Sequence, residues 1–328
     1  MKQISFSQAE FQRKKRRTRR EVFLAEMEQT MPWEELFAVV EPHYPKGKRG
    51  RLPIGLERML RVYFVQQWNG LSDEGVEDAI TDSQALRAFV GIDLSREAAP
   101  DATTVLQFRR LLEQHDLTKK LLDAVNAGLS AAGLMMREGT IADATIIAAP
   151  PSVKNEANAR DPDMHQTKKG NQWYFGMNAH IGADAESGLV HTVVGTAANE
   201  ADVTQTERLL HGEEKDAFLD AGYVGADKRK ELKDRDINWQ IAMKRGKVKA
   251  VSEESSFGQW LRRLESLKAS IRSKVEHPFH IVKNLFHYKK VRYKGLDKNT
   301  AQLHTLFALA NLMIAKRGLL ALNSQVAS

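Results

Sequence analysis

Cysteine is absent from the 328 residues of this chain, which excludes disulfide bonds, thiolate metal sites and a cysteine nucleophile. No run of 18 or more apolar residues occurs, so we expect no transmembrane helix and no membrane partner. The first residues also lack the apolar core of a signal peptide. Together these absences predict a protein of a reducing cytoplasm.

Several compact catalytic motifs are missing as well. There is no Gly-rich phosphate loop, which argues against an ATP-dependent motor, and no His-Glu-x-x-His or other compact zinc pattern. The Gly-x-Ser-x-Gly elbow is also absent, although composition alone leaves Ser–His–Asp hydrolysis open. Candidate catalytic residues are therefore expected to be scattered along the chain and brought together by the fold.

Positive charge is in excess. Lys and Arg number 49 against 42 Asp and Glu, which gives a net charge of +7 and favours a polyanionic partner. Positions 13–20 hold seven basic residues in eight, a block expected to be solvated and mobile on its own. We interpret it as an arm that neutralises DNA phosphates; the alternative is the charged face of a first helix. The basic residues are Arg13, Lys14, Lys15, Arg16, Arg17, Arg19 and Arg20.

The first part of the chain has the pattern of a helical bundle. Proline near a first turn and glycine just past the end mark helices, as at Pro53 and Gly70. The adjacent short helices 72–80 and 82–90 suit either a helix-turn-helix or ordinary bundle packing, and their acidic surface argues against groove reading. Helices are predicted over residues 33–40, 53–68, 72–80, 82–90, 101–115 and 117–132.

From residue 139 the pattern changes to strands that alternate with helices. A predicted hairpin followed by strand–helix alternation indicates a mixed α/β sheet. We therefore predict an α/β protein with an all-α domain over residues 1–133 and a mixed-sheet domain over residues 134–328. The predicted strands are 139–149, 173–183, 188–196, 216–219 and 237–243; the predicted helices are 202–211, 227–236, 256–290 with an interruption at Pro278, and 300–317.

Three acidic residues lie in settings that suggest a catalytic site. Asp143 interrupts an apolar strand, where a charge is costly unless it is paired or binds a metal. Asp220 ends a short apolar strand, the usual position of ligands in α/β sheets. Glu276 is the single acid among seven Lys and Arg between residues 272 and 294. Taken alone, Asp143 also suits a turn or an arginine partner, and Glu276 a surface salt bridge.

Two cations flank Glu276. Arg272 and Lys283 lie four residues before it and seven after it, which on one continuous helix places all three on one face. This arrangement fits a metal-binding acid between two phosphate-binding cations. Mg²⁺ prefers oxygen ligands, and two such ions activate a water and stabilise the leaving oxygen in phosphodiester cleavage. Acids in so basic a chain therefore suggest an enzyme that cuts DNA.

The acidic motifs carry a family resemblance. Asp-Ala-Thr at 143–145 and Asp-Ala-Gly-Tyr at 220–223 resemble the first two acidic motifs of the DDE transposases of bacterial insertion sequences, in particular the InsH-like group. The third motif of that family is Arg, Glu and Lys with three and six intervening residues. It is matched by Arg272, Glu276 and Lys283.

The resemblance extends over nearly the whole chain. Segments 52–60 and 100–112 are similar to the N-terminal domain of that family. The family often carries a tyrosine before the arginine of its third motif, with two intervening positions, and Ala269 occupies that position here. The three carboxylates are unaffected by this departure.

The resemblance implies an RNase H-like catalytic domain behind a helical domain for DNA binding and dimerisation. The three acids would gather around two Mg²⁺ ions, with Mn²⁺ able to replace them, and Arg272 and Lys283 would hold phosphates of the transposon end. The implied partners are the terminal repeats and target DNA, bound by a homodimer or larger synaptic assembly at the bacterial nucleoid. Two other functions share these residues: a nuclease that hydrolyses without joining, and an inactive transposase that acts as a repressor.

Overall fold

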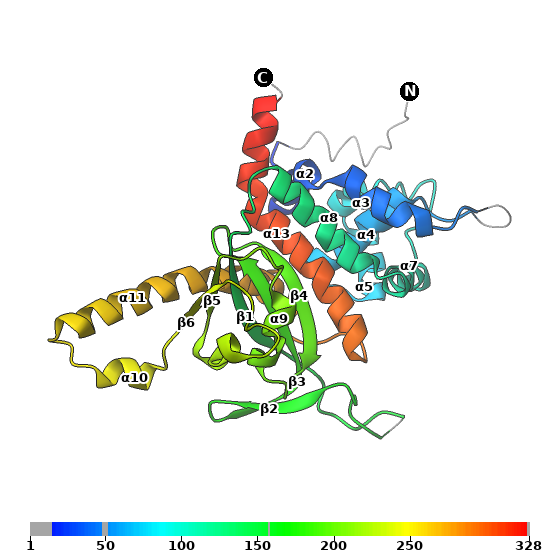
Figure 1. Ribbon diagram of the computed structural model, residues 1–328. Coiled ribbons are helices and arrows are strands. Elements are labelled where there is room, and N and C mark those ends of the chain that lie inside the picture. The colour runs from blue at the N-terminus through cyan, green and yellow to red at the C-terminus, as the bar shows by residue number, and fades with distance from the viewer. Residues whose placement is uncertain (1–14, 48–51, 157, 327–328) are drawn as a thin grey trace. The chain divides into compact units, whose positions relative to one another are not determined.

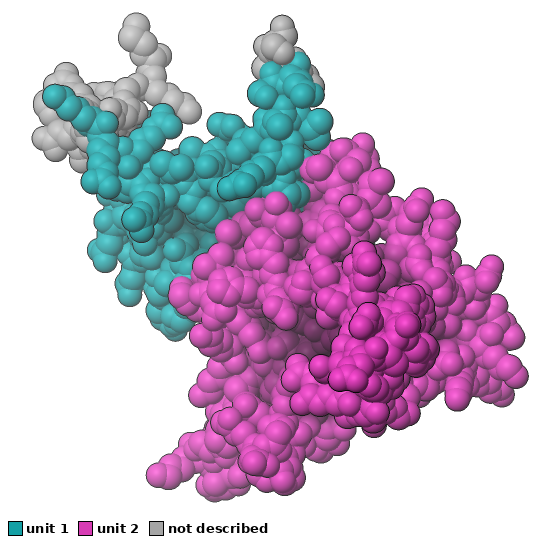
Figure 2. Space-filling view, turned by 90° about the vertical axis from the view of Figure 1, so that its left-hand side faces the viewer, with its two compact units in different colours: residues 1–125, 315–328 teal, residues 126–314 magenta. Residues whose placement is uncertain are grey.

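The computed structural model describes residues 15–47, 52–156 and 158–326 of the chain. Contacts divide the protein into two compact units (Figure 2). Unit 1 comprises residues 1–125 and 315–328, and unit 2 comprises residues 126–314. The expected α/β class, with a helical N-terminal part and a mixed sheet after it, is confirmed.

Unit 1 is helical. Its central helix is α4 (Leu56–Asn69), which buries an almost continuous apolar surface including Met59, Leu60 and Tyr63. The helix ends at Gly70, whose left-handed φ of 62° suits glycine, as the sequence predicts. The other helices are α2 (Arg19–Thr30), α3 (Trp33–Val40), η1 (Glu41–His43), α5 (Asp73–Asp82), α6 (Gln84–Val90), α7 (Ala102–Gln114) and part of α8 (Leu117–Ala131).

Hydroxyl and carboxylate caps mark the start of several of these helices, α2, α5, α6 and α7. Thr18 forms a reciprocal capping box with Glu21 at the start of α2. Ser72 accepts a hydrogen bond from the Gly75 amide at 2.9 Å, and Asp101 accepts one from the Thr104 amide at 2.7 Å. Each cap satisfies an amide that has no partner within its helix.

Unit 2 contains one mixed sheet with strand order β2-β3-β1-β5-β6, and β4 also pairs with β3 (Figure 1). Strands β2, β1 and β4 run antiparallel to β3, whereas β1, β5 and β6 are parallel. Burial follows the sheet, because β3 buries its last nine residues in a row. The bounds are β1 (Gly139–Ala148), β2 (His165–Lys169), β3 (Gln172–Asp184), β4 (Val190–Ala197), β5 (Asp216–Leu219) and β6 (Asn238–Ile241).

Two of the predicted helices of unit 2 are wrong or shorter than predicted. Residues 227–236 form only the 3₁₀ turn η4 (Ala226–Lys228) followed by turns. Leu232 is the single buried apolar residue of that segment, so a helix there would have no apolar face to pack. Residues 202–211 form the 3₁₀ turn η2 (Asp202–Gln205) and one α-turn, α9 (Thr206–Leu209).

The helical stretch after residue 256 is interrupted elsewhere than predicted. Helix α11 (Ser256–Arg272) passes through the 3₁₀ turn η5 (Ser273–Val275) into α12 (Glu276–His280) and the π-turn η6 (Ile281–Leu285). Pro278 lies in the first turn of α12, where its missing N–H is not needed. The break therefore precedes Pro278. Figure 1 shows α11 and the unpredicted α10 (Arg245–Ala250) extending away from the sheet as an arm.

Helix α13 (Leu296–Val326) is longer than the predicted 300–317. Among the described helices it alone is long and apolar enough to cross a membrane by length and composition, and half of the tested window is buried in the protein. Its buried polar residues are hydrogen-bonded, as in a core helix: Asn299 accepts from the Tyr288 hydroxyl and Asn311 from the Val190 amide.

Candidate active site

Parallel pairing of β1 and β5 brings two of the predicted acids together. Ala142 of β1 and Leu219 of β5 are direct partners, and both are fully buried. The residues that follow them are Asp143 and Asp220, so the two carboxylates leave neighbouring strands at the same level of the sheet. This placement depends on the strand register alone.

Backbone amides hold both carboxylates. Asp143 Oδ1 accepts a hydrogen bond from the Ala144 amide, and Asp220 Oδ1 accepts one from the Gly222 amide, each at 2.7 Å. Asp220 thereby caps the 3₁₀ turn η3 (Ala221–Tyr223) at the end of β5. A carboxylate held by an amide has a defined direction before any ligand arrives.

The electrostatics of Asp143 are those of an acid that needs a cation. Burial raises its pKa to about 6, and the negative charge of Asp220 adds to this effect. The hydrogen bond from Ala144 and the positive charges of Arg272 and Lys169 act in the opposite direction without cancelling it. Two such oxygen donors suit Mg²⁺, so the pair fits a divalent ion chemically.

Both predicted phosphate-binding cations lie near this pair. Arg272 is the last residue of α11, and it lines a cavity of about 470 Å³ together with Asp220. Lys283 lies in η6, where its Nζ donates to Thr145 Oγ1 at 2.6 Å. Thr145 is two residues after Asp143 on β1 and therefore on the same face of the strand. Burial, followed by the charges of Lys169 and Lys289, lowers the pKa of Lys283.

Glu276 is the first residue of α12, and its side chain is exposed. It lies in the chain between Arg272, whose charge acts on Asp143, and Lys283, which donates to Thr145 two residues after Asp143. Among the described residues, no three acids or histidines stand close enough together to hold a metal ion directly. The structure thus brings Asp143, Asp220 and Arg272 together, and Glu276 remains a predicted member of the site.

Three residues near the acid pair were not predicted as members of the site. Lys169 of β2 lowers the pKa of Asp143, Asp202 is an additional acid beside Asp220, and Tyr223 is a buried phenol close to all three aspartates. Strand β2 reads His-Gln-Thr-Lys-Lys, which has no apolar alternation that would have revealed it. Asp-Ala-Gly-Tyr contains Tyr223, so the motif did hold a signal for that residue.

The basic block is partly helical. Arg13 and Lys14 lie outside the described residues, whereas Lys15, Arg16 and Arg17 are exposed and precede α2. Arg19 and Arg20 form the first turn of α2, so part of the basic block belongs to a helix. Positive side chains at a helix N-terminus oppose the helix dipole, and a bound anion would relieve that conflict. All described members of the block are exposed.

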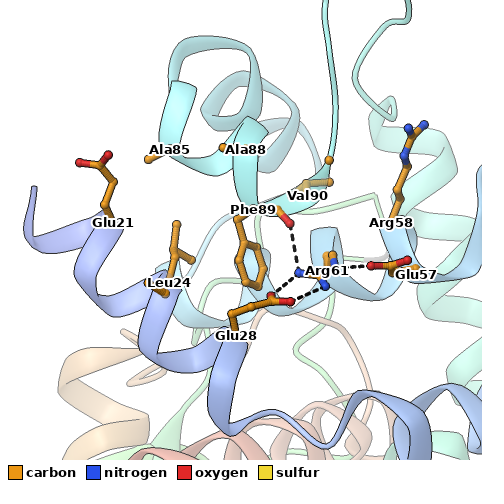
Figure 3. A pocket seen from close by; sticks show the side chains of 12 residues that line it. Glu21, Leu24, Glu28, Glu57, Arg58, Arg61, Ala85, Ala88, Phe89 and Val90 are labelled. Carbon is orange, nitrogen blue, oxygen red and sulfur yellow. Dashed lines mark hydrogen bonds and ion pairs between the residues drawn. The ribbon is translucent and has the colours of Figure 1, made fainter. Parts of the chain in front are cut away.

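A separate cavity of about 550 Å³ lies within unit 1 (Figure 3). Arg61 projects into it and donates to Glu28 at 2.8 Å and to Glu57 at 3.0 Å. Its guanidinium also lies 4.2 Å from the centre of the Trp33 ring. Because its central charges pair with one another, we interpret this cluster as a structural one.

The paired helices α5 and α6 meet at Ser83, which ends one and caps the other. Asp73 of α5 forms an ion pair with Arg109 of α7 at 2.6 Å, and Glu77 accepts a hydrogen bond from the Ala102 amide. Part of the acidity predicted for the surface of this pair therefore serves packing within unit 1.

Unit 2 is thus a mixed α/β domain in which an acid pair and cations meet beside a parallel strand pair, as suits an enzyme that acts on a phosphodiester. Comparison with known families agrees: residues 135–312 match the family described as "Transposase DDE domain", and residues 11–111 match "Transposase domain (DUF772)". The chain belongs to the DDE transposases. Membership implies a DNA substrate, nuclease and transposition activity, and the use of divalent metal ions.

Proposed function

We propose that this protein binds the terminal inverted repeats of an insertion sequence, cleaves DNA at those ends and joins them to target DNA. The observation that carries the proposal is the register of β1 and β5, which sets Asp143 beside Asp220 with Arg272 nearby. An acid pair next to cations is what in-line attack of an oxygen nucleophile on phosphorus requires.

Asp143, Asp220 and Glu276 are proposed as the carboxylates that hold Mg²⁺. Two ions, or Mn²⁺ in their place, would supply a polarised water or hydroxyl and neutralise the leaving oxygen. The inclusion of Glu276 rests on the Arg, Glu and Lys motif, in which Arg272 acts on the charge of Asp143 and Lys283 donates to Thr145 on the same strand. No covalent enzyme–DNA intermediate is required, so no nucleophilic side chain is needed.

Arg272 and Lys283 are proposed to hold phosphates of the element's end. Lys283 is held by its hydrogen bond to Thr145, so its charge has a defined position beside β1. A Lys ammonium acts as a point charge toward phosphate, and an Arg guanidinium adds bidentate geometry. These two cations would align the scissile phosphate with the carboxylates.

The basic block is proposed as the main source of sequence-independent DNA affinity. Its described members, Lys15, Arg16, Arg17, Arg19 and Arg20, are exposed, and Arg13 and Lys14 would extend them. Each phosphate contact releases counterions, which makes the affinity strongly dependent on salt. We further propose residues 1–133 as the DNA-binding and dimerisation domain and residues 134–328 as the catalytic domain. Pairing of two ends at the nucleoid would require a homodimer or larger assembly.

The test uses purified full-length protein and DNA that carries the flanks of its gene, with Mg²⁺ present or chelated. Wild type is compared with Asp143→Asn and with Asp227→Asn, which removes the same charge from an exposed position. We expect Mg²⁺-dependent cuts at the repeat ends and joined products for wild type and Asp227→Asn only. Cuts without joined products would favour a simple nuclease, and metal-independent binding without cuts would favour a repressor.

A further inference from the structure

Tyr223 packs at the point where three aspartates converge. Its fully buried ring belongs to the cluster that contains Ala142 and Leu219, and Val203 packs against the same cluster. These three neighbours are each adjacent in the chain to one aspartate: Asp143, Asp220 and Asp202 respectively. The ring therefore lies against the backbone segments that carry all three carboxylates.

The hydroxyl of Tyr223 has no hydrogen-bond partner among the residues that the structure describes, although it is buried. Burial first, and then the negative charges of Asp202, Asp143 and Asp220, raises the pKa of this phenol well above its ordinary value of 10. The hydroxyl consequently keeps its proton and can donate it to an acceptor near the aspartates. Buried polar groups in proteins are almost always hydrogen-bonded, so this donor calls for a partner.

Asp202 is the second element of the cluster. It is the first residue of the 3₁₀ turn η2. Its Oδ1 lies 3.6 Å from Nδ1 of His180, a buried residue whose Nε2 pairs with Thr196 Oγ1 at 2.8 Å. Burial lowers the pKa of His180 to about 4, so the histidine is neutral near pH 7 and does not compensate Asp202.

Asp202 is also coupled to the proposed active site. Its pKa is raised by burial and then by the charge of Asp220, and it is lowered by Lys169. The same Lys169 acts on Asp143. An acid that shares its charged neighbours with the proposed catalytic pair is more than a turn residue.

We propose that Asp202 and Tyr223 are positioning residues for a cation held by Asp143 and Asp220. They would hydrogen-bond to water molecules on that cation, with the Tyr223 hydroxyl donating and the Asp202 carboxylate accepting. This inference rests on the proposed function. Water-mediated partners of this kind orient the groups that touch the ion, and their loss typically lowers metal affinity about 10–100-fold.

The first measurement is the binding of Mn²⁺ to the metal-free full-length protein. Electron paramagnetic resonance of the free ion reports how much Mn²⁺ remains unbound. The variants are Asp202→Asn and Tyr223→Phe, with Asp143→Asn as the direct-ligand variant and Asp227→Asn as the exposed control. We expect the dissociation constant to rise about 10-fold for Asp202→Asn and several-fold for Tyr223→Phe, and to stay unchanged for Asp227→Asn.

The second measurement is the Mg²⁺ concentration for half-maximal DNA cleavage, taken beside the thermal unfolding midpoint. A positioning role predicts that Asp202→Asn needs about 10-fold more Mg²⁺, recovers its rate at high Mg²⁺ and unfolds like wild type. Wild-type metal affinity in both variants, with binding lost in Asp143→Asn, would overturn this inference and leave the proposed function intact. Absence of Mn²⁺ binding in wild type itself would overturn both.

Discussion

Asp143 and Asp220 lie side by side because the residues before them, Ala142 and Leu219, are partners across two parallel strands. Neither acid is close to the other in the chain, and no loop conformation is needed to join them. A shift of β5 against β1 by one residue would separate the carboxylates and turn the side chains of the shifted strand to the other face of the sheet. The packing that fixes this register is therefore a condition for the proposed chemistry.

The first prediction concerns the stability cost of Asp143. Its folded pKa of about 6 lies above the ordinary 3.8, so the proton binds more tightly to the folded protein. This stabilisation is complete below pH 3.8 and is lost as the pH rises through 6, at a cost of about 3 kcal/mol at most. Asp143→Asn should remove that loss, because an amide does not ionise.

Urea unfolding of the metal-free protein between pH 4 and pH 8 measures this effect. The unfolding free energy of Asp143→Asn should exceed that of wild type at pH 7 and approach it at pH 4. Asp227→Asn, at an exposed position, should follow wild type throughout. If the unfolding free energies of wild type and Asp143→Asn changed with pH in parallel over this range, ionisation of Asp143 would not destabilise the folded protein.

The acid pair also shows how much of the site the sequence predicts. The short apolar run that ends at Asp220 was readable as a strand, and the apolar run around Asp143 as another. The sequence patterns contain no register, so the pairing of Ala142 with Leu219 had to come from the structure. The resemblance supplied the expectation that the acids meet.

Other features lacked a local signal. Lys169 lies on β2, a polar strand that forms through its pairing with β3. Asp202 had the sequence context of an ordinary helix start. The segment 227–236 had the charge pattern of a surface helix but lacked the apolar stripe needed to pack one. In each case tertiary pairing or packing, which acts at long range in the chain, decided the outcome.

The second prediction concerns Lys283, whose ammonium is hydrogen-bonded to Thr145. Lys283→Met should lower the rate of end cleavage at saturating DNA about 100-fold, because it removes a charge proposed to face the scissile phosphate. It should also reduce the slope of log affinity against log salt by about 1. Thr145→Val keeps the Lys283 charge and removes only the hydrogen bond that holds it. The salt slope should therefore stay at the wild-type value, and the rate should fall less than in Lys283→Met.

Single-turnover cleavage and salt titrations of DNA binding measure both quantities. Lys119→Met is the control, since Lys119 pairs with Asp123 on the exposed face of α8. Equal salt slopes and rates for Lys283→Met and Lys119→Met would contradict the proposed phosphate contact.

The third prediction separates charge from stability at the start of α2. Arg16 and Arg17 are exposed and precede the helix, so replacing both with alanine should leave the unfolding midpoint unchanged. The slope of log affinity against log salt should fall by about 2, because two phosphate contacts are lost. Thr18→Ala should do the reverse: it removes the capping box and costs about 1 kcal/mol, while the salt slope stays. A loss of stability without a change of slope in the arginine variant would assign these residues to the fold.

The fourth prediction concerns a buried amide that ties α13 to the sheet of unit 2. Asn311 accepts a hydrogen bond from the Val190 amide at 2.8 Å and donates to Asn126 Oδ1 at 2.8 Å. Asn311→Leu would leave both groups buried without a partner and should cost about 3 kcal/mol. Asn323→Ala, on the exposed end of the same helix, removes a hydrogen bond to the Gln29 carbonyl and should cost about 0.5 kcal/mol. Urea unfolding distinguishes the two, and equal losses would mean that the Asn311 network contributes no more than a surface contact.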